Sequence, residues 1–337
     1  MRTSRRYSHV FSALVVVLLA VSAHAADPGQ IVPANSPISD QKAGSVLVYN
    51  VYTSSITSFL MQNSRISLTN TSEFIPAFVH LFFVDGASCS VADSYACLTP
   101  NQTISFLAAD LDPGITGYLV AVAVDNRGCP VKHNFLIGDV FVKFASGHFG
   151  NLAAVSIAAQ FDTFTGCTAS STTATLVFDA PDVPNSYNYL PRTVAISSVA
   201  DKATGNDMLL ILNRIGGNLG TGIGGLGNLS GLLYDDGENA FSYTFSASTC
   251  QFRSPLSNNF PRTAPRFETI ITAGRSGWTK LSAENTNFGL LGATFNNNSN
   301  VAAAPNAFNG AHNLHVMTLN NAGAAVNLII PVFPPSC

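Results

Sequence analysis

The chain has 337 residues, of which 47% are hydrophobic and only 10% are charged, against about 25% charged residues in an average protein. Its formal net charge of −3 at pH 7 excludes the strongly basic surface typical of nucleic-acid-binding proteins. The length exceeds what one hydrophobic core comfortably holds, so two domains are expected.

The first residues, 1–25, predict a secretory signal peptide. Arg2, Arg5 and Arg6 form a positive segment, an apolar run follows from Phe11 to Val21, and the segment ends in the small-residue pattern Ala-His-Ala. We therefore expect cleavage there and a secreted protein, extracellular or periplasmic. No later stretch reaches the roughly 20 apolar residues of a membrane-spanning helix, so no membrane span is expected after cleavage.

Short strands are predicted over most of the first half. Residues 26–43 are rich in Pro, Ser, Asp and Asn and predict a flexible lead-in. Ile66 to Thr69 alternates with a period of two, whereas Phe78 to Val84 and Tyr118 to Val124 are continuous apolar runs bounded by turn residues. We predict seven to nine strands within residues 44–178, at the spacing typical of a β-sandwich.

A second block repeats the first in outline. Residues 179–192 contain three prolines and predict a linker, and residues 193–337 form the second block. In each block a strand ending in Asn precedes an apolar strand ending in Asp-Gly, and a glycine-bounded loop then precedes an aromatic residue. The matching pairs are Ile66–Asn70 with Leu209–Asn213, Phe82–Gly86 with Leu232–Gly237, and Asp112–Tyr118 with Thr272–Trp278.

This order of motifs resembles the immunoglobulin-like modules of secreted bacterial surface proteins, in which an Asn-ended strand, an Asp-Gly turn and a Pro-Gly loop recur. The resemblance covers Gly44 to Phe178 best and the second block loosely. It implies an all-β protein with two tandem immunoglobulin-like β-sandwich domains held by disulfides. Because these are turn motifs, they specify architecture and imply no catalytic residues.

Two segments are predicted to depart from the strand pattern. The segment from Ile215 to Gly231 is rich in glycine, and Gly222 to Gly227 has the Gly-x-Gly-x-x-Gly spacing. No helix pattern follows, so we reject a dinucleotide site and expect a long mobile loop. Leu152 to Gln160 predicts a short helix, since Ala and Leu dominate it and Asn151 is a suitable N-cap.

All the cysteines are expected to form disulfide bonds in an oxidising compartment. Proximity along the chain favours bonds within each domain, although the sequence does not choose between the many pairings. The favoured pairs are Cys89 with Cys97, Cys129 with Cys167, and Cys250 with Cys337. No spacing fits a zinc site, so neither a metal nor a cofactor is expected.

No catalytic constellation is evident. His312 and His315 have the spacing of a ligand pair, but a solvated pair is the favoured interpretation because no third ligand is near in sequence. The acidic cluster at 235–238 fits a tight turn better than a calcium site. Ser276 lies in a glycine-bounded turn without a recognisable His or Asp partner. His80 alternates with apolar residues and is expected on the solvent side of its strand.

One segment, from Cys250 to Lys280, is rich in arginine and aromatic residues. Guanidinium groups pair with carboxylate or sulfate, and an aromatic face stacks on a sugar ring. A ligand site is therefore a hypothesis, whose alternative is that the aromatic residues are core and the arginines bind loop carbonyls. The candidate residues, called the arginine segment below, are Arg253, Arg262, Arg266, Arg275 and Trp278.

The sequence thus favours a secreted or cell-surface, non-enzymatic protein with a structural or adhesive role. The alternative is a carbohydrate- or polyanion-binding module that uses the arginine segment, with an extracellular glycan or another envelope protein as its partner. A secreted hydrolase is the third hypothesis.

Overall fold

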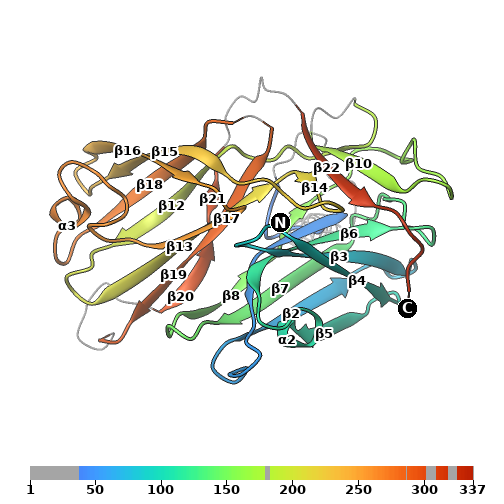
Figure 1. Ribbon diagram of the computed structural model, residues 1–337, viewed down its shortest axis with the longest axis horizontal. Helices are drawn as coiled ribbons and strands as arrows, with labels where there is room; N and C mark the ends of the chain where they lie inside the picture. The colour runs from blue at the N-terminus through green and yellow to red at the C-terminus, as the bar shows by residue number, and fades with distance from the viewer. Residues whose placement is uncertain (1–37, 179–182, 286, 301–308, 318–324, 337) are drawn as a thin grey trace, which may run out of the picture.

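The computed structural model describes residues 38–178, 183–285, 287–300, 309–317 and 325–336. The predicted signal peptide and most of the lead-in lie outside these ranges. The described residues form β-strands and two short helices (Figure 1), which confirms the all-β prediction. No helix among them is long and apolar enough to cross a membrane.

The first sandwich pairs two antiparallel sheets. Sheet A has the order β4 (Val91–Leu98), β3 (Ala77–Asp85), β6 (Thr116–Val124), β1 (Val46–Thr53), β9 (Val155–Ile157). Sheet B has the order β5 (Thr103–Leu107), β2 (Asn63–Asn70), β7 (Leu136–Lys143), β8 (Phe149–Ala153), and α2 (Ala108–Leu111) follows β5.

The second sandwich has the same topology, strand for strand. Sheet D has the order β16 (Ala240–Ala247), β15 (Gly227–Tyr234), β18 (Ser276–Ala283), β12 (Thr193–Ala200), β21 (His315–Val316). Sheet E has the order β17 (Gln251–Pro255), β13 (Asn206–Ile215), β19 (Gly289–Asn298), β20 (Gly310–Asn313), and α3 (Phe267–Ile270) follows β17. The motif pairs found in the sequence therefore lie on equivalent strands, such as β2 and β13.

A third layer covers the outer face of sheet A. Sheet C has the order β11 (Ser186–Tyr187), β10 (Thr173–Phe178), β22 (Val326–Pro331), β14 (Gly217–Asn218). One core joins its Leu176 and Leu328 to Phe82 and Val120 of sheet A. Sheet A is consequently buried on both faces, which explains its continuous apolar runs. β22, close to the C-terminus, pairs with β10, so the end of the chain returns to the first sandwich.

Two predictions about local structure are wrong. Glycine-rich residues 216–227 are not a mobile loop, because Leu219 and Leu226 are buried and the Leu219 amide donates to the Ile329 carbonyl at 2.8 Å. The glycines allow this close packing: a Cβ on Gly225 would overlap the carbonyl oxygen of Ser248. The predicted helix from Leu152 to Gln160 is instead the end of β8 followed by β9, which pairs with β1.

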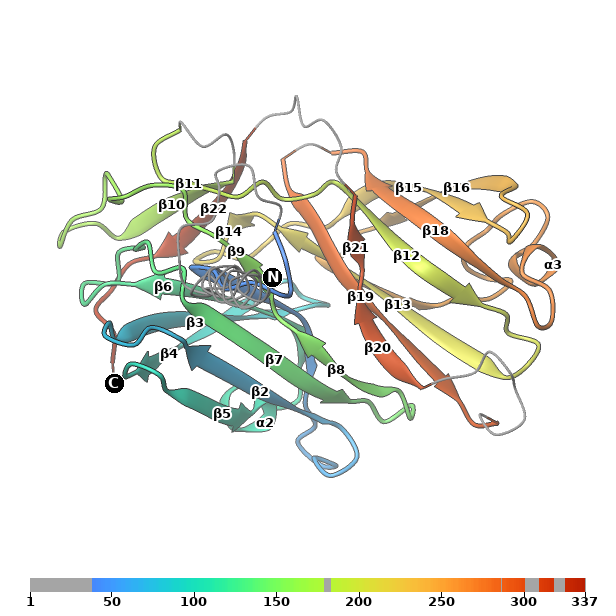
Figure 2. The same cartoon turned by 180° about the vertical axis from the view of Figure 1, so that it is seen from behind.

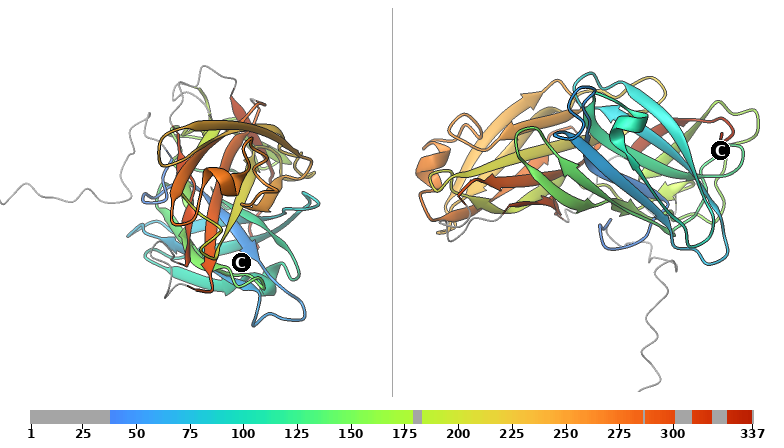
Figure 3. Two further views of the ribbon diagram at one scale, coloured as in Figure 1. Left: turned by 90° about the vertical axis from the view of Figure 1, so that its left-hand side faces the viewer. Right: turned by 90° about the horizontal axis from the view of Figure 1, so that it is seen from below.

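The two sandwiches lie side by side along the long axis of the molecule, with sheet E against the first sandwich (Figures 2 and 3). Ile211, Ala293 and Phe295 of sheet E belong to the same core as sheets A and B. Phe295 meets Phe144 edge to face, with ring centroids 5.3 Å apart.

A disulfide bond crosses the junction between the two sandwiches. Cys89, in the turn between β3 and β4, is bonded to Cys250, just before β17. The predicted pairings of Cys89 with Cys97 and of Cys250 with Cys337 are therefore wrong, whereas the bond between Cys129 and Cys167 is confirmed. Sequence proximity misled because the β3–β4 turn lies against β17, where the Gln251 amide donates to the Gly86 carbonyl at 3.3 Å. Cys97 is also disulfide-bonded.

Candidate functional site

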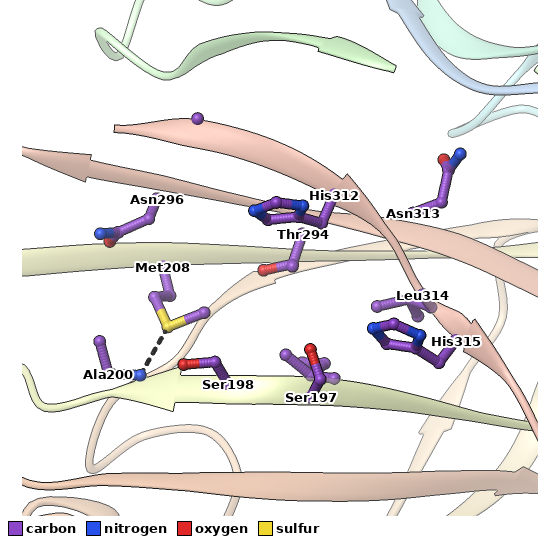
Figure 4. Close-up of a pocket in the computed structure, with 12 residues that line it drawn as sticks. Ser197, Ser198, Ala200, Met208, Thr294, Asn296, His312, Asn313, Leu314 and His315 are labelled. Atoms are coloured by element: carbon purple, nitrogen blue, oxygen red, sulfur yellow. Dashed lines mark hydrogen bonds between the residues drawn. The ribbon is translucent and has the colours of Figure 1, made fainter. Parts of the chain in front are cut away.

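A pocket of about 220 Å³ opens at one edge of the second sandwich, where the chain passes from β20 in sheet E to β21 in sheet D. Figure 4 shows His312 and His315 on this segment, Ser197 and Ser198 on the facing strand β12, and Thr294 between them. Met208 and Asn296 also line the pocket, from the inner face of sheet E.

Local irregularities of two strands create the pocket. The register of β12 on β18 shifts between Ile196 and Val199, so the two serines between them are both exposed. In a regular strand one of two neighbouring side chains would be buried. A bulge changes the direction in which the side chains point, so that both can be exposed. Opposite, Leu314 is buried and its amide donates to the Gly292 carbonyl at 2.9 Å, which leaves His312 and His315 exposed on either side of it.

The pocket lining contains no Asp, Glu, Lys or Arg, and one of its hydroxyl groups has no hydrogen-bond partner within the described part of the chain. Thr294 is only 6% exposed, and its Oγ1 has no hydrogen-bond partner among the described residues. Met208 Sδ accepts a hydrogen bond from the Ala200 amide at 3.0 Å, and the Asn296 amide group donates to Asn206 at 2.9 Å. The pocket therefore offers hydroxyl and imidazole groups above an apolar floor, a lining suited to a small uncharged ligand.

His312 and His315, the pair that the sequence singled out, line this pocket together. No group of three His, Cys, Asp or Glu side chains in the described part of the chain is placed to hold a metal ion. Ser276 is exposed at the start of β18.

The structure divides the arginine segment between the two sheets. Arg253 lies opposite Ile211 on β13, on the face of sheet E that meets the first sandwich. Arg275 forms an ion pair with Asp236, and Trp278 stacks flat on Tyr234 with ring centroids 4.0 Å apart. Arg275 lies in the turn just before β18 and Trp278 lies on β18, so these two residues are near each other beside the stacked aromatic pair.

Several other residues between Cys250 and Lys280 have the roles expected in the alternative hypothesis, in which the aromatic residues are core and the arginines bind loop carbonyls. Phe252 and Phe260, both partly buried, have ring centroids 5.0 Å apart and pack against the core of the second sandwich, in which Phe267 is buried. Arg266 donates to the Asn258 carbonyl at 3.1 Å. Arg262 is exposed in the loop before α3. Sequence reasoning missed Tyr234, whose apolar strand pattern gave no sign of the stacking partner.

Two other candidate groups have structural roles. Asp235 Oδ1 accepts the Gly237 and Asn239 amides at 2.9 and 2.8 Å, and the bonds from Asn239 hold the pKa of this carboxyl below its usual value. The acidic cluster thus stabilises its turn. His80 is fully buried, contrary to expectation, because Tyr95 of β4 and Phe333, just beyond β22, pack on its ring with centroids 4.2 and 5.0 Å away. It bonds Asp93 at 2.8 Å, and burial lowers its pKa.

A chain of buried amides crosses the junction between the sandwiches. Gln251 donates to the Asn213 side chain at 2.9 Å, and Asn213 donates to the Asn50 carbonyl at 2.7 Å. The Asn50 side chain donates in turn to Asn313 at 2.8 Å, and Asn313 donates to the Ala153 carbonyl at 2.8 Å. Polar groups from both sandwiches therefore satisfy one another beside the bond that joins Cys89 and Cys250, and all of them except the half-buried Asn313 lie away from water.

Comparisons with known proteins do not identify a relative of this chain. No protein-family model and no curated protein sequence matches it. The structure of Thermotoga maritima 1070 aligns with 8% identity over 34% of this chain and 92% of that chain, with a TM-score of 0.26. A mutant of the major pilin from Streptococcus pyogenes aligns with 9% identity over 86% and 98%, with a TM-score of 0.20. Scores this low do not indicate a shared fold.

Proposed function

We propose that the protein is a secreted, non-enzymatic structural component of the cell surface, in which the two sandwiches act as one stiff unit. The observation that carries this proposal is the junction, where a disulfide bond and a chain of buried amides link sheet E to the first sandwich. Disulfide bonds also fit an oxidising compartment outside the cytoplasm.

The junction resists bending because opening it breaks bonds that water cannot easily replace. Each buried amide left without its partner costs about 1–3 kcal/mol. The bond between Cys89 and Cys250 spans 161 residues, and closing so long a loop stabilises the folded chain by about 5 kcal/mol in the chain-entropy model. A hinge between two independently moving domains would instead have a small, polar and hydrated interface.

Stretching single molecules from their two ends tests the mechanical part of this proposal. While the bond between Cys89 and Cys250 is intact, the residues between them add no length to the stretched chain. Because the other disulfide bonds would also shorten the stretched chain, Cys97, Cys129, Cys167 and Cys337 are first replaced by serine in both proteins. In that background we expect Cys89→Ser/Cys250→Ser to add roughly 550 Å to the extension, given about 3.4 Å per residue over the 161 residues. Separate low-force opening of the two sandwiches in the natural protein would contradict a stiff unit.

Location tests the other part of the proposal. An antibody raised against the purified protein should label intact cells of the organism that makes it, and protease added outside those cells should remove the label. A protein found only inside the cytoplasm would not be a surface component, whatever its mechanical properties.

The pocket supports a second candidate function, recognition of a small uncharged ligand such as a sugar unit of a neutral glycan. The specific observation in its favour is the unpartnered Thr294 hydroxyl. A glycan panel should show binding that is insensitive to salt and lost in Thr294→Val. Binding that weakens with salt and falls on charge reversal at Arg262 or Arg266 would instead assign recognition to the arginine segment.

A further inference from the structure

Residues 54–62, which connect β1 to β2 and are called the apolar loop here, expose large hydrophobic side chains. Ile56 and Leu60 are 73% and 77% exposed, and Phe59 and Met61 are 56% and 57% exposed. The loop projects alone from the lower side of the first sandwich in Figures 1 and 2. Soluble proteins seldom gather exposed apolar groups in this way unless another surface covers them.

The second sandwich shows that the fold does not require these side chains. The equivalent connection, between β12 and β13, is residues 201–205, with the polar sequence Asp-Lys-Ala-Thr-Gly. Its turn is formed by Asp201, whose carboxylate accepts the Thr204 amide at 2.8 Å. A short polar turn is therefore sufficient to connect these two strands. The exposed apolar side chains of the longer loop in the first sandwich are not needed for the fold and require another explanation.

Part of the backbone of the apolar loop is hydrogen-bonded within the protein. The Met61 and Gln62 amides donate to the Ser58 carbonyl at 2.8 and 2.9 Å, and the Ser58 amide donates to Ser55 Oγ at 3.0 Å. Lys143 Nζ donates to the Leu60 carbonyl at 2.9 Å. Since unpaired backbone groups are costly in a lipid phase, these bonds make entry of the loop tip into lipid less unfavourable.

Two cations lie at the base of the loop. Arg65 and Lys143 are exposed on the outer face of sheet B, where Lys143 pairs with Asn63 at the start of β2 and Arg65 pairs with the part-exposed Phe141. Within the part of the chain that the structure describes, neither cation belongs to an ion pair. Basic groups beside an apolar tip complement the phosphates of anionic lipids.

We propose that the apolar loop inserts into the boundary between headgroups and acyl chains of an anionic lipid bilayer, with Arg65 and Lys143 at the level of the phosphates. The shape of the loop favours lipid over a protein partner. A typical protein interface buries about 800 Å² on each side, and a narrow tip of four side chains does not supply that area.

Vesicle binding by the whole secreted chain tests this proposal. We expect the natural protein to co-sediment with vesicles of phosphatidylcholine and phosphatidylglycerol, and the variant Phe59→Asp/Leu60→Asp to bind at least about tenfold more weakly. Arg65→Ser should weaken binding about fivefold, and only when the vesicles contain phosphatidylglycerol. Lys143→Ser should weaken it at least as much, and to a smaller extent also on vesicles of phosphatidylcholine alone, because it leaves the Leu60 carbonyl without its donor. The matched control is Phe74→Asp, at a side chain that is 84% exposed beyond the other end of β2, and it should bind normally.

A fluorescent reporter locates the contact. Trp278 is the only tryptophan, so Phe59→Trp combined with Trp278→Phe gives a single reporter, whose emission should shift to the blue and be quenched by brominated lipids.

Unchanged unfolding midpoints will show that all the variants are folded. Absence of vesicle binding by the natural protein, or equal loss in Phe74→Asp, would overturn the proposal. So would self-association that depends on Phe59 without any lipid binding, because the loop would then be a protein contact.

Discussion

At the scale of single residues, the hydrogen bonds of a buried polar group indicate whether that group stabilises the fold or is available to a ligand. Thr279 and Thr294 are both buried threonines of the second sandwich. The Thr279 hydroxyl bonds the Tyr243 hydroxyl at 2.9 Å and the Leu232 carbonyl at 3.0 Å. The Thr294 hydroxyl has no partner among the described residues and faces the pocket.

These two threonines should therefore respond in opposite ways to the same substitution. Thr294→Val keeps the shape of the side chain and removes a desolvated hydroxyl, so we expect the free energy of unfolding to rise by about 1 kcal/mol. Thr279→Val, the matched control, should lower it by about 2 kcal/mol, because the Tyr243 hydroxyl loses its acceptor. Urea denaturation measures both. Equal destabilisation by the two variants would show that Thr294 is a structural residue and not a ligand group.

Buried histidine makes stability depend on pH. Burial lowers the pKa of His133 to about 4, and its Nε2 lies 3.0 Å from the Asn70 side-chain oxygen. Below a pH of about 6.5 the unfolded chain takes up a proton at this histidine that the folded chain does not. The stabilising effect is thus complete above about pH 6.5 and is lost as the pH falls towards 4.

We expect His133 to account for about 2 kcal/mol of the stability lost between about pH 7 and pH 5. Burial lowers the pKa of His80 as well, so the natural protein should lose more than this in total. His133→Gln retains a donor for Asn70 but does not titrate, and its unfolding free energy should fall correspondingly less over the same range. Parallel losses in the two proteins would mean that His133 is not the group responsible.

At the scale of elements, β22 shows how a distant segment completes a core. Leu328 is fully buried between sheets A and C, whereas its neighbour Asn327 is exposed. We expect Leu328→Ala to lower the free energy of unfolding by about 2–5 kcal/mol, because it removes apolar contacts and leaves a cavity. Asn327→Ala should change it by less than about 0.5 kcal/mol. A small effect of Leu328→Ala in chemical denaturation would mean that the third layer contributes little to the fold.

Local patterns predicted the strands correctly but not their neighbours. The runs from Phe78 to Val84 and from Tyr118 to Val124 are strands β3 and β6, and their unbroken apolar character already reflects burial on both faces. The sequence did not show which segment covers the outer face of sheet A, because β22 pairs with β10 across a long separation in sequence. The segment around Val155 was misassigned because its alanine content favours a helix, whereas pairing with β1 decides its conformation.

For the candidate site, too, the sequence indicated only residues that lie close to one another along the chain. The sequence singled out His312 and His315 as a pair. It did not indicate Thr294 or the two serines of β12, which reach the pocket from other strands of the second sandwich. The partner of Cys89 was missed for the same reason, since nothing near it in sequence shows that its turn meets β17.

At the scale of the whole molecule, the junction makes the two sandwiches mutually dependent. Tyr118, from sheet A, donates its hydroxyl to the Arg214 carbonyl of β13 at 2.6 Å. His148, in the turn between β7 and β8, bonds the Asp207 carbonyl at 2.8 Å. Together with the disulfide bond and the buried amides, these contacts couple both ends of sheet E to the first sandwich, so neither half is expected to unfold alone.

Calorimetry should therefore show one unfolding transition for the natural protein. The variant Cys89→Ser/Cys250→Ser/Asn213→Ala removes the disulfide and leaves the Asn50 carbonyl and the Gln251 amide without their partner. We expect its transition to split in two, as the sandwiches unfold separately. The matched control, Cys129→Ser/Cys167→Ser, removes a bond that closes only 38 residues within the first half. That control should lower the midpoint without splitting the transition, since the junction is untouched. Two transitions in the natural protein itself would show that the sandwiches are independent and that the junction does not couple them.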